Sequence, residues 1–465
     1  MGFTYSTEMP RLKGARVTVM GLGLSGGGSG VARFLARQGA NVTVTDLKAE
    51  KDLCEPMGEL AGLPIEFHLG GHRDEDFAKA DLVIVNPAIP DSSREVAIAA
   101  ANRVPLETEM NLFFKVCPTR RIAGVTGSNG KTTTSALLGE LLSRGPAKVH
   151  VGGNIGRSLL EVAIAPEDVV VLELSSFQLE NLDALRVSPT VSVVMNLTPN
   201  HLDRHGTMAN YAAAKRVIVK HQRAEDTKVL NADDPLVAAF ASPSLTRWFS
   251  LKRPCFAPSR GASQGKPADA YAHDDVIETP NGAIDVTGRK IPGWFNLQNM
   301  AAATLAASAV WPGVLGVARE VLTGFKGVEH RLELVGDVGG VTYYNDSIAT
   351  NPESTLAALD TLKGGIVLLL GGRDKNLDFN ALGRRVAERV RVAVLMGETA
   401  SKIAGAIPAG PEVRRAATFE EAVRLAKEAA KPGETVLLSP ACASFDMFRN
   451  YAERGRRFKE LVRGV

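Results

Sequence analysis

The sequence predicts an α/β protein built from three domains. Its 465 residues are enough for about three domains of roughly 150 residues each. Short apolar runs alternate with helical stretches along most of the chain, which is typical of parallel sheets covered by helices. Two glycine-rich turns directly follow apolar runs, where parallel sheets commonly hold phosphate groups. We place the domains at residues 1–110, 111–328 and 329–465.

The first domain is expected to be a Rossmann-like unit. Residues 15–20, 41–45 and 81–85 are apolar runs of strand length, and residues 31–37 belong to a helical stretch. Strands that alternate with helices at this spacing pair in parallel.

The second domain begins with a strand at residues 121–125, which runs into a glycine-rich turn and a helix at residues 132–142. Residues 168–172 and 190–195 are further buried strands. This order predicts a central domain of the P-loop ATPase type. Between residues 252 and 293 the composition shifts toward Pro, Gly, Ser and Asp, which indicates an added β layer with exposed loops.

The predicted β layer includes a strand at residues 283–286, and a helix at residues 298–311 closes the domain. The α/β pattern then returns, which predicts a second Rossmann-like unit at the C-terminus. Its expected strands are residues 341–344, 366–370, 392–396 and 435–438.

The composition excludes several classes of protein. The hydrophobic class makes up 45% of the residues, which is enough for full cores and argues against disorder. Lys and Arg total 54 against 51 for Asp and Glu, so a dedicated nucleic-acid binder is not expected. Scattered cysteines, no signal peptide and no long apolar run indicate a cytoplasmic protein without a membrane partner. No coiled-coil stretch is visible, so we expect a monomer.

The strongest motif follows the predicted strand at residues 121–125. It reads Thr-Gly-Ser-Asn-Gly-Lys-Thr-Thr from Thr126 to Thr133 and opens a helix. Backbone N–H groups of such a loop cradle phosphate oxygens, and the positive end of the helix dipole adds to the attraction. The lysine supplies a charge for the terminal phosphates, and the hydroxyl that follows it suits Mg²⁺. The sequence therefore predicts ATP and Mg²⁺ at Gly127, Ser128, Asn129, Gly130, Lys131, Thr132 and Thr133.

A second glycine motif follows the first predicted strand. Gly21, Gly23 and Gly26 have the spacing of a dinucleotide fingerprint, and Asp46 ends the next strand. Taken alone, this motif would indicate an NAD-dependent dehydrogenase. The same turn could instead hold the diphosphate of another nucleotide, such as a UDP-linked substrate.

Three further positions in the second domain suit metal or phosphate chemistry. Glu173 ends a buried strand after the phosphate loop, as expected of a Mg²⁺ ligand. His201, Asp203 and His205 together resemble a zinc-binding group, but alternate residues on one loop rarely close a tetrahedral site. We favour a single histidine, His201, beside oxygen ligands of Mg²⁺. Lys215 lies in a helical stretch, where the simplest interpretation is a solvated lysine.

The sequence resembles the Mur ligases of peptidoglycan synthesis, with matching segments in all three domains. The run Glu-Leu-Ser-Ser-Phe-Gln-Leu-Glu and the run Ser-Pro-Ala-Cys-Ala-Ser resemble those of the members that add glutamate. The matching segments are residues 124–134, 173–180, 196–215, 231–234, 330–331 and 439–444.

The resemblance implies an ATP-dependent amide ligase that acts on UDP-N-acetylmuramoyl-L-alanine and glutamate through an acyl phosphate. It assigns the first glycine turn to UDP, which argues against the dehydrogenase. The residues that match the family's ATP and Mg²⁺ positions are Lys131, Thr132, Glu173, His201, Asn296, Asn299, Arg331 and Asp346. Lys215 matches a lysine that is carbamylated in the family and helps to hold Mg²⁺. Of these, Lys131, His201, Lys215 and Arg331 are the expected catalytic group.

The resemblance also implies the substrate pockets. The nucleotide substrate would contact Leu24, Ser25, Asp46, Lys48, Asn86 and Asn154, and the amino acid would contact Thr350, Lys375, Ser444, Phe445 and Tyr451. Two positions depart from the pattern of D-glutamate ligases, because Ile348 replaces a lysine and Tyr451 a phenylalanine. We expect D-glutamate as the substrate, with L-glutamate as the alternative.

Overall fold

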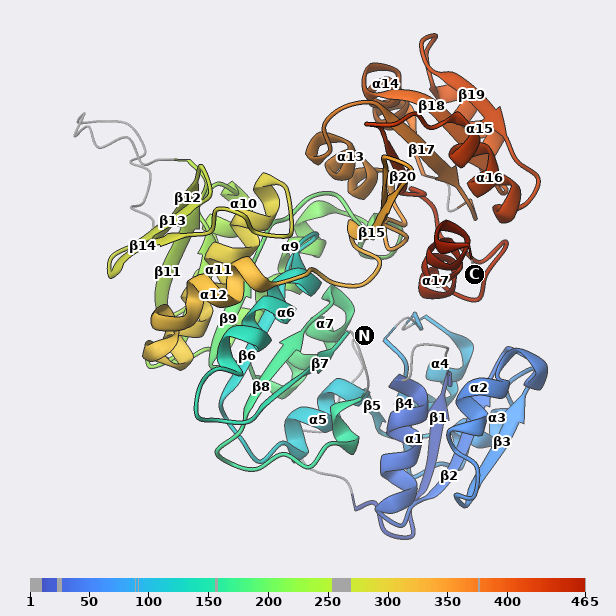
Figure 1. Ribbon diagram of the computed structural model, residues 1–465. Helices are drawn as coiled ribbons and strands as arrows, with labels where there is room; N and C mark the ends of the chain where they lie inside the picture. Colours follow the sequence, from blue (N-terminus) through green and yellow to red (C-terminus); the bar gives the residue numbers. More distant parts are fainter. Residues whose placement is uncertain are drawn as a thin grey trace. The chain divides into compact units, whose positions relative to one another are not determined.

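The structure is a computed structural model that describes residues 11–22, 27–87, 89–90, 92–154, 158–252, 269–374 and 377–464, apart from the side chains of Glu55 and Asp203 (Figure 1). Three sheets organise these residues. The chain divides into two compact units. One unit comprises residues 1–287 and 297–322, and the other comprises residues 288–296 and 323–465.

The first sheet is parallel and has the order β3-β2-β1-β4-β5. Its strands are β1 (Arg16–Met20), β2 (Asn41–Asp46), β3 (Ile65–Leu69), β4 (Leu82–Val85) and β5 (Leu106–Glu107). The connecting elements are α1 (Gly27–Arg37), η1 (Glu50–Asp52), α2 (Cys54–Gly58), α3 (Asp74–Ala78) and α4 (Arg94–Ala101). The strand order reverses between β1 and β4, and ligands of such sheets bind at the carboxyl ends of the strands at that point.

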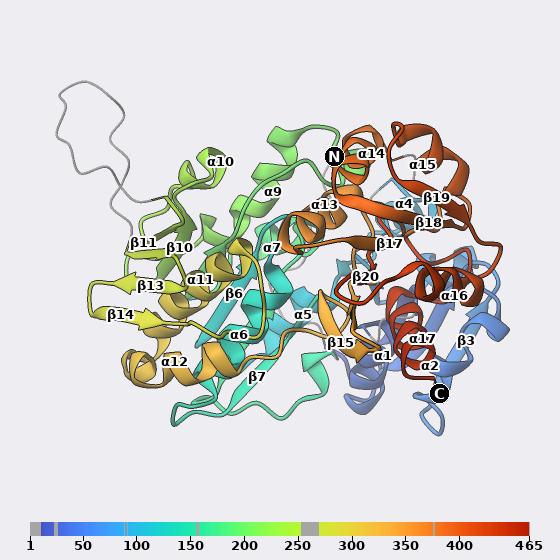
Figure 2. The same ribbon diagram turned by 45° about the horizontal axis from the view of Figure 1, so that its top comes forward.

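The second sheet has the order β14-β13-β12-β11-β10-β9-β6-β8-β7. Its parallel strands are β6 (Ile122–Thr126), β7 (Val149–Gly153), β8 (Val169–Glu173), β9 (Val191–Val194), β10 (Thr227–Asn231), β11 (Leu245–Ser250) and β12 (Ala270–His273). The antiparallel strands β13 (Val276–Thr279) and β14 (Gly282–Asp285) continue it at one edge (Figure 2). These strands are the predicted β layer.

Helices cover the second sheet. They are α5 (Glu109–Val116), α6 (Lys131–Leu142), η2 (Leu159–Glu161), α7 (Ser176–Leu185), α8 (Leu202–His205), α9 (Met208–Lys220), α10 (Pro235–Ala238), α11 (Trp294–Val310), η3 (Pro312–Val314) and α12 (Leu315–Gly324). Helix α7 begins with a capping box, in which the Ser175 hydroxyl accepts from the Gln178 N–H and the Gln178 side chain accepts from the Ser175 N–H. This cap fixes the chain direction immediately after β8.

The third sheet has the order β15-β16-β20-β17-β18-β19. Strand β15 (Glu333–Val338) is antiparallel to β16 (Val341–Asn345), and the others, β17 (Ile366–Gly371), β18 (Val390–Met396), β19 (Glu412–Arg415) and β20 (Thr435–Leu438), are parallel. Its helices are α13 (Pro352–Thr361), α14 (Asn380–Arg389), α15 (Ala400–Ala406), α16 (Phe419–Ala429) and α17 (Tyr451–Arg463). Every residue of β17 is buried, as expected of an interior parallel strand.

The predicted fold class is therefore confirmed. The predicted strands named above all correspond to observed strands, with ends that differ by one or two residues. No helix in the described part of the chain has both the length and the apolar character needed to cross a bilayer.

Candidate functional site

The phosphate loop lies at the carboxyl end of β6 and opens α6, as predicted. Gly130 caps the helix with a φ of 85°, in the left-handed region that glycine adopts without strain. The loop is braced by the residues after β9, because the Asn129 N–H donates to Asn196 Oδ1 (2.8 Å) and the Ser128 hydroxyl donates to the Thr198 carbonyl (2.9 Å). These hydrogen bonds fix the loop in position at the N-terminus of α6.

The loop's lysine and one asparagine of α11 both lie against the phosphate loop. Lys131 Nζ donates to the carbonyls of Gly127 and Ser128, each at 3.0 Å. A Cβ on Gly130 would stand 2.6 Å from Asn299 Oδ1, so the asparagine packs directly on the loop. Thr134 donates to the same oxygen at 3.3 Å. Asn299 is therefore a neighbour of the phosphate loop, and Asn296 lies one turn earlier on the same helix.

Glu173 ends β8, the strand next to β6, so its carboxylate and the phosphate loop lie at neighbouring strand ends. One oxygen, Oε1, accepts from Asn154 Nδ2 at 3.0 Å. The other oxygen, Oε2, is buried and has no hydrogen-bond partner among the described residues. Because a buried carboxylate oxygen without a partner is costly, this atom is suited to a cation.

Lys215 is buried, with 2% of its surface exposed, so the solvated interpretation of this residue is wrong. Its Nζ donates to the hydroxyl of Thr126 (3.2 Å), the residue that ends β6. Burial, reinforced by the charge of Lys131 and opposed by that of Glu173, lowers the pKa of the Lys215 amine well below its ordinary range. This shift makes loss of a proton from the Lys215 amine easier than for an exposed lysine.

Tyr211 belongs to the same site, although the sequence analysis did not select it. It is buried one turn before Lys215 on α9, and Lys215 Nζ lies 5.0 Å from the centroid of its ring. Its hydroxyl and that of Ser128 are 3.0 Å apart. The four-residue spacing of Tyr211 and Lys215, which places both on one helix face, was the available signal.

The two histidines at the start and end of α8, His201 and His205, have different environments. His201 begins the helix with a φ of 53° and is exposed. His205 is buried, lies 3.0 Å from the Ser176 hydroxyl through Nε2, and stacks on Phe177 with the ring centroids 5.3 Å apart. His205 Nδ1 lies 3.3 Å from Glu180 Oε1, so both ring nitrogens have polar partners, which favours His201 over His205 as a metal ligand.

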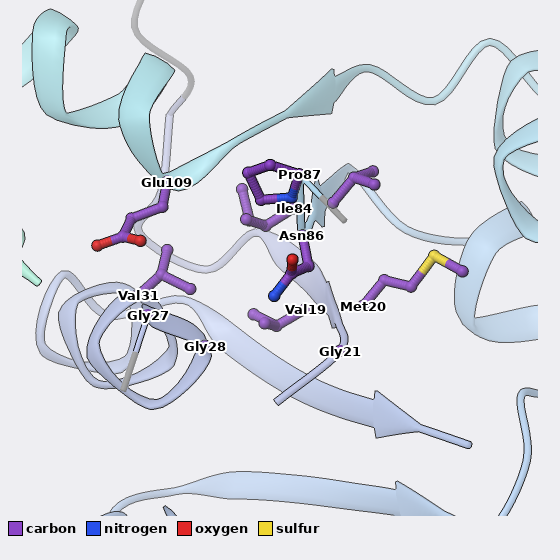
Figure 3. A pocket seen from close by; sticks show the side chains of 11 residues that line it. Val19, Met20, Gly21, Gly27, Gly28, Val31, Ile84, Asn86, Pro87 and Glu109 are labelled. Atoms are coloured by element: carbon purple, nitrogen blue, oxygen red, sulfur yellow. The ribbon is translucent and has the colours of Figure 1, made fainter. Parts of the chain in front are cut away.

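The glycine turn of the first sheet is tied to β2 through Asp46. This carboxylate accepts from the Leu22 N–H (3.0 Å) and the Lys48 N–H (2.9 Å). Asn86 follows β4 and packs on Gly21. A Cβ added to Gly21 would stand 3.4 Å from the Cβ of Asn86. Figure 3 shows the Asn86 side chain reaching toward the glycine backbone and Glu109 above Gly27. Leu24 and Ser25 lie outside the described residues.

The third sheet gathers the remaining predicted residues at the carboxyl ends of β16 and β20. Asp346 is buried and accepts from the Leu332 N–H (3.1 Å) and the Ser439 hydroxyl (2.8 Å). Burial raises its pKa to about 7, and the nearby charge of Arg331 opposes the rise. Arg331 Nε is buried without a hydrogen-bond partner in the described part of the chain.

The residues expected to contact the amino acid differ in burial. Ser444 is buried, Thr350 is half-buried, and the rings of Phe445 and Tyr451 are exposed. The Tyr451 carbonyl accepts from the Ser347 hydroxyl at 2.7 Å, which joins α17 to the loop after β16. Lys375 falls outside the described residues.

A second residue that the sequence analysis missed, Arg454, lies beneath this loop. It is fully buried (0% exposed) and donates to the Ser347 hydroxyl (3.0 Å), the Ser347 carbonyl (2.8 Å) and the Cys442 carbonyl (3.1 Å). It therefore joins the segment after β16 to the segment after β20. Burial lowers its pKa to about 10, which still leaves it charged at neutral pH.

Replacing Arg454 with alanine should lower the free energy of unfolding by about 3 kcal/mol, because each abandoned buried acceptor costs about 1–3 kcal/mol. Chemical denaturation measures the change. Arg463→Ala, at an exposed position near the end of the same helix, is the control and should be neutral. Equal stability of the two variants would show that Arg454 is not a structural tie.

A phosphate loop beside a buried acid and a buried lysine defines an ATP-using class of enzyme. Models of three families match this chain: Mur ligase MurD-like, N-terminal domain (residues 15–107), Mur ligase middle domain (residues 125–307) and Mur ligase, glutamate ligase domain (residues 330–442). The chain belongs to the Mur ligase family. It is an ATP-dependent acid–amino acid ligase, which excludes the dehydrogenase interpretation.

Two curated relatives, both called UDP-N-acetylmuramoylalanine--D-glutamate ligase, match nearly the whole chain. The one from Roseiflexus sp. is 45% identical over 97% of this chain and 99% of its own length. The one from Symbiobacterium thermophilum is 44% identical over 97% of this chain and 98% of its own length.

Solved structures share the fold at low sequence identity. The UDP-N-acetylmuramate-alanine ligase MurC from Thermotoga maritima has a TM-score of 0.63 and 19% identity over 97% of this chain and 99% of its own. A pseudomurein peptide ligase type C from Methanothermus fervidus has a TM-score of 0.60 and 21% identity over 96% of this chain and 100% of its own.

Proposed function

We propose that this enzyme joins D-glutamate to the alanine carboxyl group of UDP-N-acetylmuramoyl-L-alanine, with ATP as co-substrate, in the synthesis of peptidoglycan precursors. The observation that carries the proposal is near-complete coverage by relatives of that name at 44–45% identity. The buried Glu173–Lys215 site beside the phosphate loop supports it. In this proposal the enzyme acts as a monomer in the cytoplasm.

The reaction needs activation because a carboxylate is a poor electrophile. A carboxylate oxygen of alanine attacks the γ-phosphorus of ATP, the bond to the β-bridging oxygen breaks, and ADP leaves. The glutamate amine then attacks the carbonyl carbon of the acyl phosphate through a tetrahedral intermediate. The C–O bond to phosphate breaks and one proton leaves the nitrogen, which yields the amide and inorganic phosphate.

The proposed role of the phosphate loop is charge stabilisation. Backbone N–H groups at Gly130 and Lys131 point toward the space before α6, where the helix dipole favours anions. In this proposal Lys131 Nζ, which donates to two loop carbonyls in the structure, turns toward a terminal phosphate when ATP binds. Arg331 adds a second cation. Gly127, Ser128, Asn129, Thr132, Thr133, Asn296, Asn299 and Asp346 complete the proposed ATP site.

The residues present fit Mg²⁺, which prefers oxygen ligands. Glu173 Oε2 is buried and has no hydrogen-bond partner in the part of the chain that the structure describes, and the Thr132 hydroxyl lies at the start of α6. With His201, these residues would hold the ion, which when bound neutralises charge on the phosphates. A Lys215 amine that has lost its ammonium proton can add to CO₂ with loss of one further proton, and the resulting carbamate would supply a further anionic oxygen.

The substrates are proposed to bind at the carboxyl ends of the first and third sheets. The nucleotide substrate would contact Leu24, Ser25, Asp46, Lys48, Asn86 and Asn154. The glutamate would contact Thr350, Lys375, Ser444, Phe445 and Tyr451. The domain limits 1–110, 111–328 and 329–465 are part of the same proposal.

The test is phosphate release from ATP in the presence of UDP-N-acetylmuramoyl-L-alanine, with D-glutamate and L-glutamate in parallel. We expect turnover with D-glutamate and at least about tenfold less with L-glutamate, a difference of about 1.4 kcal/mol in the barrier. Turnover with L-glutamate alone would overturn the stereochemical part and direct attention to Ile348 and Tyr451. The absence of phosphate release with either amino acid would overturn the substrate assignment.

A further inference from the structure

Arg204, on a helix of the second sheet, contacts the segment that follows strand β4 of the first sheet. It lies on α8, three residues after His201. Its Nη1 donates to the Pro87 carbonyl (2.8 Å) and its Nη2 to the Ile89 carbonyl (3.2 Å). One guanidinium group therefore holds two carbonyls of the segment that follows β4.

That segment forms one side of the nucleotide pocket. The Ile89 N–H donates to the Asn86 carbonyl at 2.9 Å, which closes a turn. A Cβ on Gly21 would lie 3.4 Å from Asn86 Cβ and 3.6 Å from Ile89 Cδ1. The turn thus packs on the glycine backbone at the reversal point of the sheet, where nucleotides bind.

The guanidinium is itself held by the chain after β8. Its Cζ lies 4.5 Å from the centroid of the Phe177 ring, within the range of a cation–π contact. The same ring meets His201 edge-on, with centroids 5.1 Å apart. Phe177 therefore contacts both the arginine that holds the segment after β4 and the histidine proposed for the metal site.

We infer that Arg204 is a positioning residue for the nucleotide substrate: it fixes the turn at Asn86–Ile89 against the glycine backbone and links that turn, through Phe177, to His201. The inference rests on the proposed function for the identity of the nucleotide. A planar guanidinium suits this task because its N–H groups reach two carbonyls at once while its face stacks on a ring. A lysine ammonium group has donors too, but it lacks the planar face that stacks on a ring and the fixed fork of N–H groups.

The test compares Arg204→Ala with Arg204→Lys and Phe177→Leu. We expect the Kd of UDP-N-acetylmuramoyl-L-alanine, measured by calorimetry without ATP, to rise about tenfold in Arg204→Ala, or about 1.4 kcal/mol. Arg204→Lys and Phe177→Leu should give smaller rises. The Kd of ATP should change less than twofold. Arg223→Ala is the matched control, because that side chain is exposed and only pairs loosely with Glu225.

Amide hydrogen exchange provides a readout that needs no substrate. The Ile89 N–H should exchange faster in Arg204→Ala than in the wild type, and at the wild-type rate in Arg223→Ala. Unchanged exchange and an unchanged Kd in folded Arg204→Ala would overturn the inference. Failure of the wild type itself to bind the nucleotide would instead overturn the proposed substrate, while the exchange result would still decide whether Arg204 holds the turn. If Arg204→Ala does not fold, Phe177→Leu and Arg204→Lys decide by the same two measurements.

Discussion

Lys131→Ala is expected to abolish ATP-dependent phosphate release while the protein stays folded. The lysine is the one cation of the phosphate loop, and loss of a charge aimed at a transferring phosphoryl group costs on the order of a thousandfold or more in rate. The fold should survive because the side chain is only half-buried and its visible hydrogen bonds go to two loop carbonyls. Steady-state phosphate release and thermal unfolding together measure the effect.

Lys148→Ala is the control for this variant, because Lys148 is exposed and lies outside the phosphate loop. It should keep wild-type turnover. Retained turnover in Lys131→Ala would contradict the assignment of the loop. A Tm far below that of the control would show instead that Lys131 is a structural residue.

Lys215→Ala is expected to lose most activity, by on the order of a thousandfold, and to recover part of it when formate or acetate is added. Truncation of a buried side chain leaves a cavity beside Thr126 and Glu173. A small carboxylate that enters this cavity would supply the anionic oxygen that the carbamate is proposed to provide. Phosphate release at increasing carboxylate concentration measures the recovery.

The control lies five residues further along α9. Lys220 is partly exposed and pairs with Asp183 at 2.8 Å, so Lys220→Ala should retain activity and should not respond to carboxylates. Wild-type activity in Lys215→Ala would show that the carbamate proposal is wrong. A severe loss with no recovery by any short carboxylate would indicate that the lysine serves only as packing.

The features that the sequence predicted depend on local patterns. The phosphate loop is one continuous motif. The glycine before its lysine predicts the left-handed backbone conformation that Gly130 adopts. Glu173 could be predicted because it directly follows an apolar strand. Fold class followed for the same reason, since strand and helix periodicity are properties of short segments.

The features that the sequence did not predict depend on contacts between distant segments. The resemblance marked Lys215 as a site residue, but the residues alone did not predict its burial, because one lysine on a helix usually points to solvent. The strand end at Thr126 and the ring of Tyr211 enclose it. Arg454 is one of several arginines in α17, and only the tertiary structure places it under the loops at Ser347 and Cys442. Arg204 likewise acquires its role from carbonyls more than a hundred residues earlier in the chain.

The most direct test of the proposed reaction follows an oxygen atom. UDP-N-acetylmuramoyl-L-alanine with heavy oxygen in its alanine carboxylate is incubated with ATP, D-glutamate and the enzyme, and the inorganic phosphate is analysed by mass spectrometry. Attack of that carboxylate on the γ-phosphorus predicts one heavy oxygen in each phosphate released and an amide-linked glutamate in the product. Unlabelled phosphate would contradict the account, because ATP would then be cleaved without activating the alanine carboxylate.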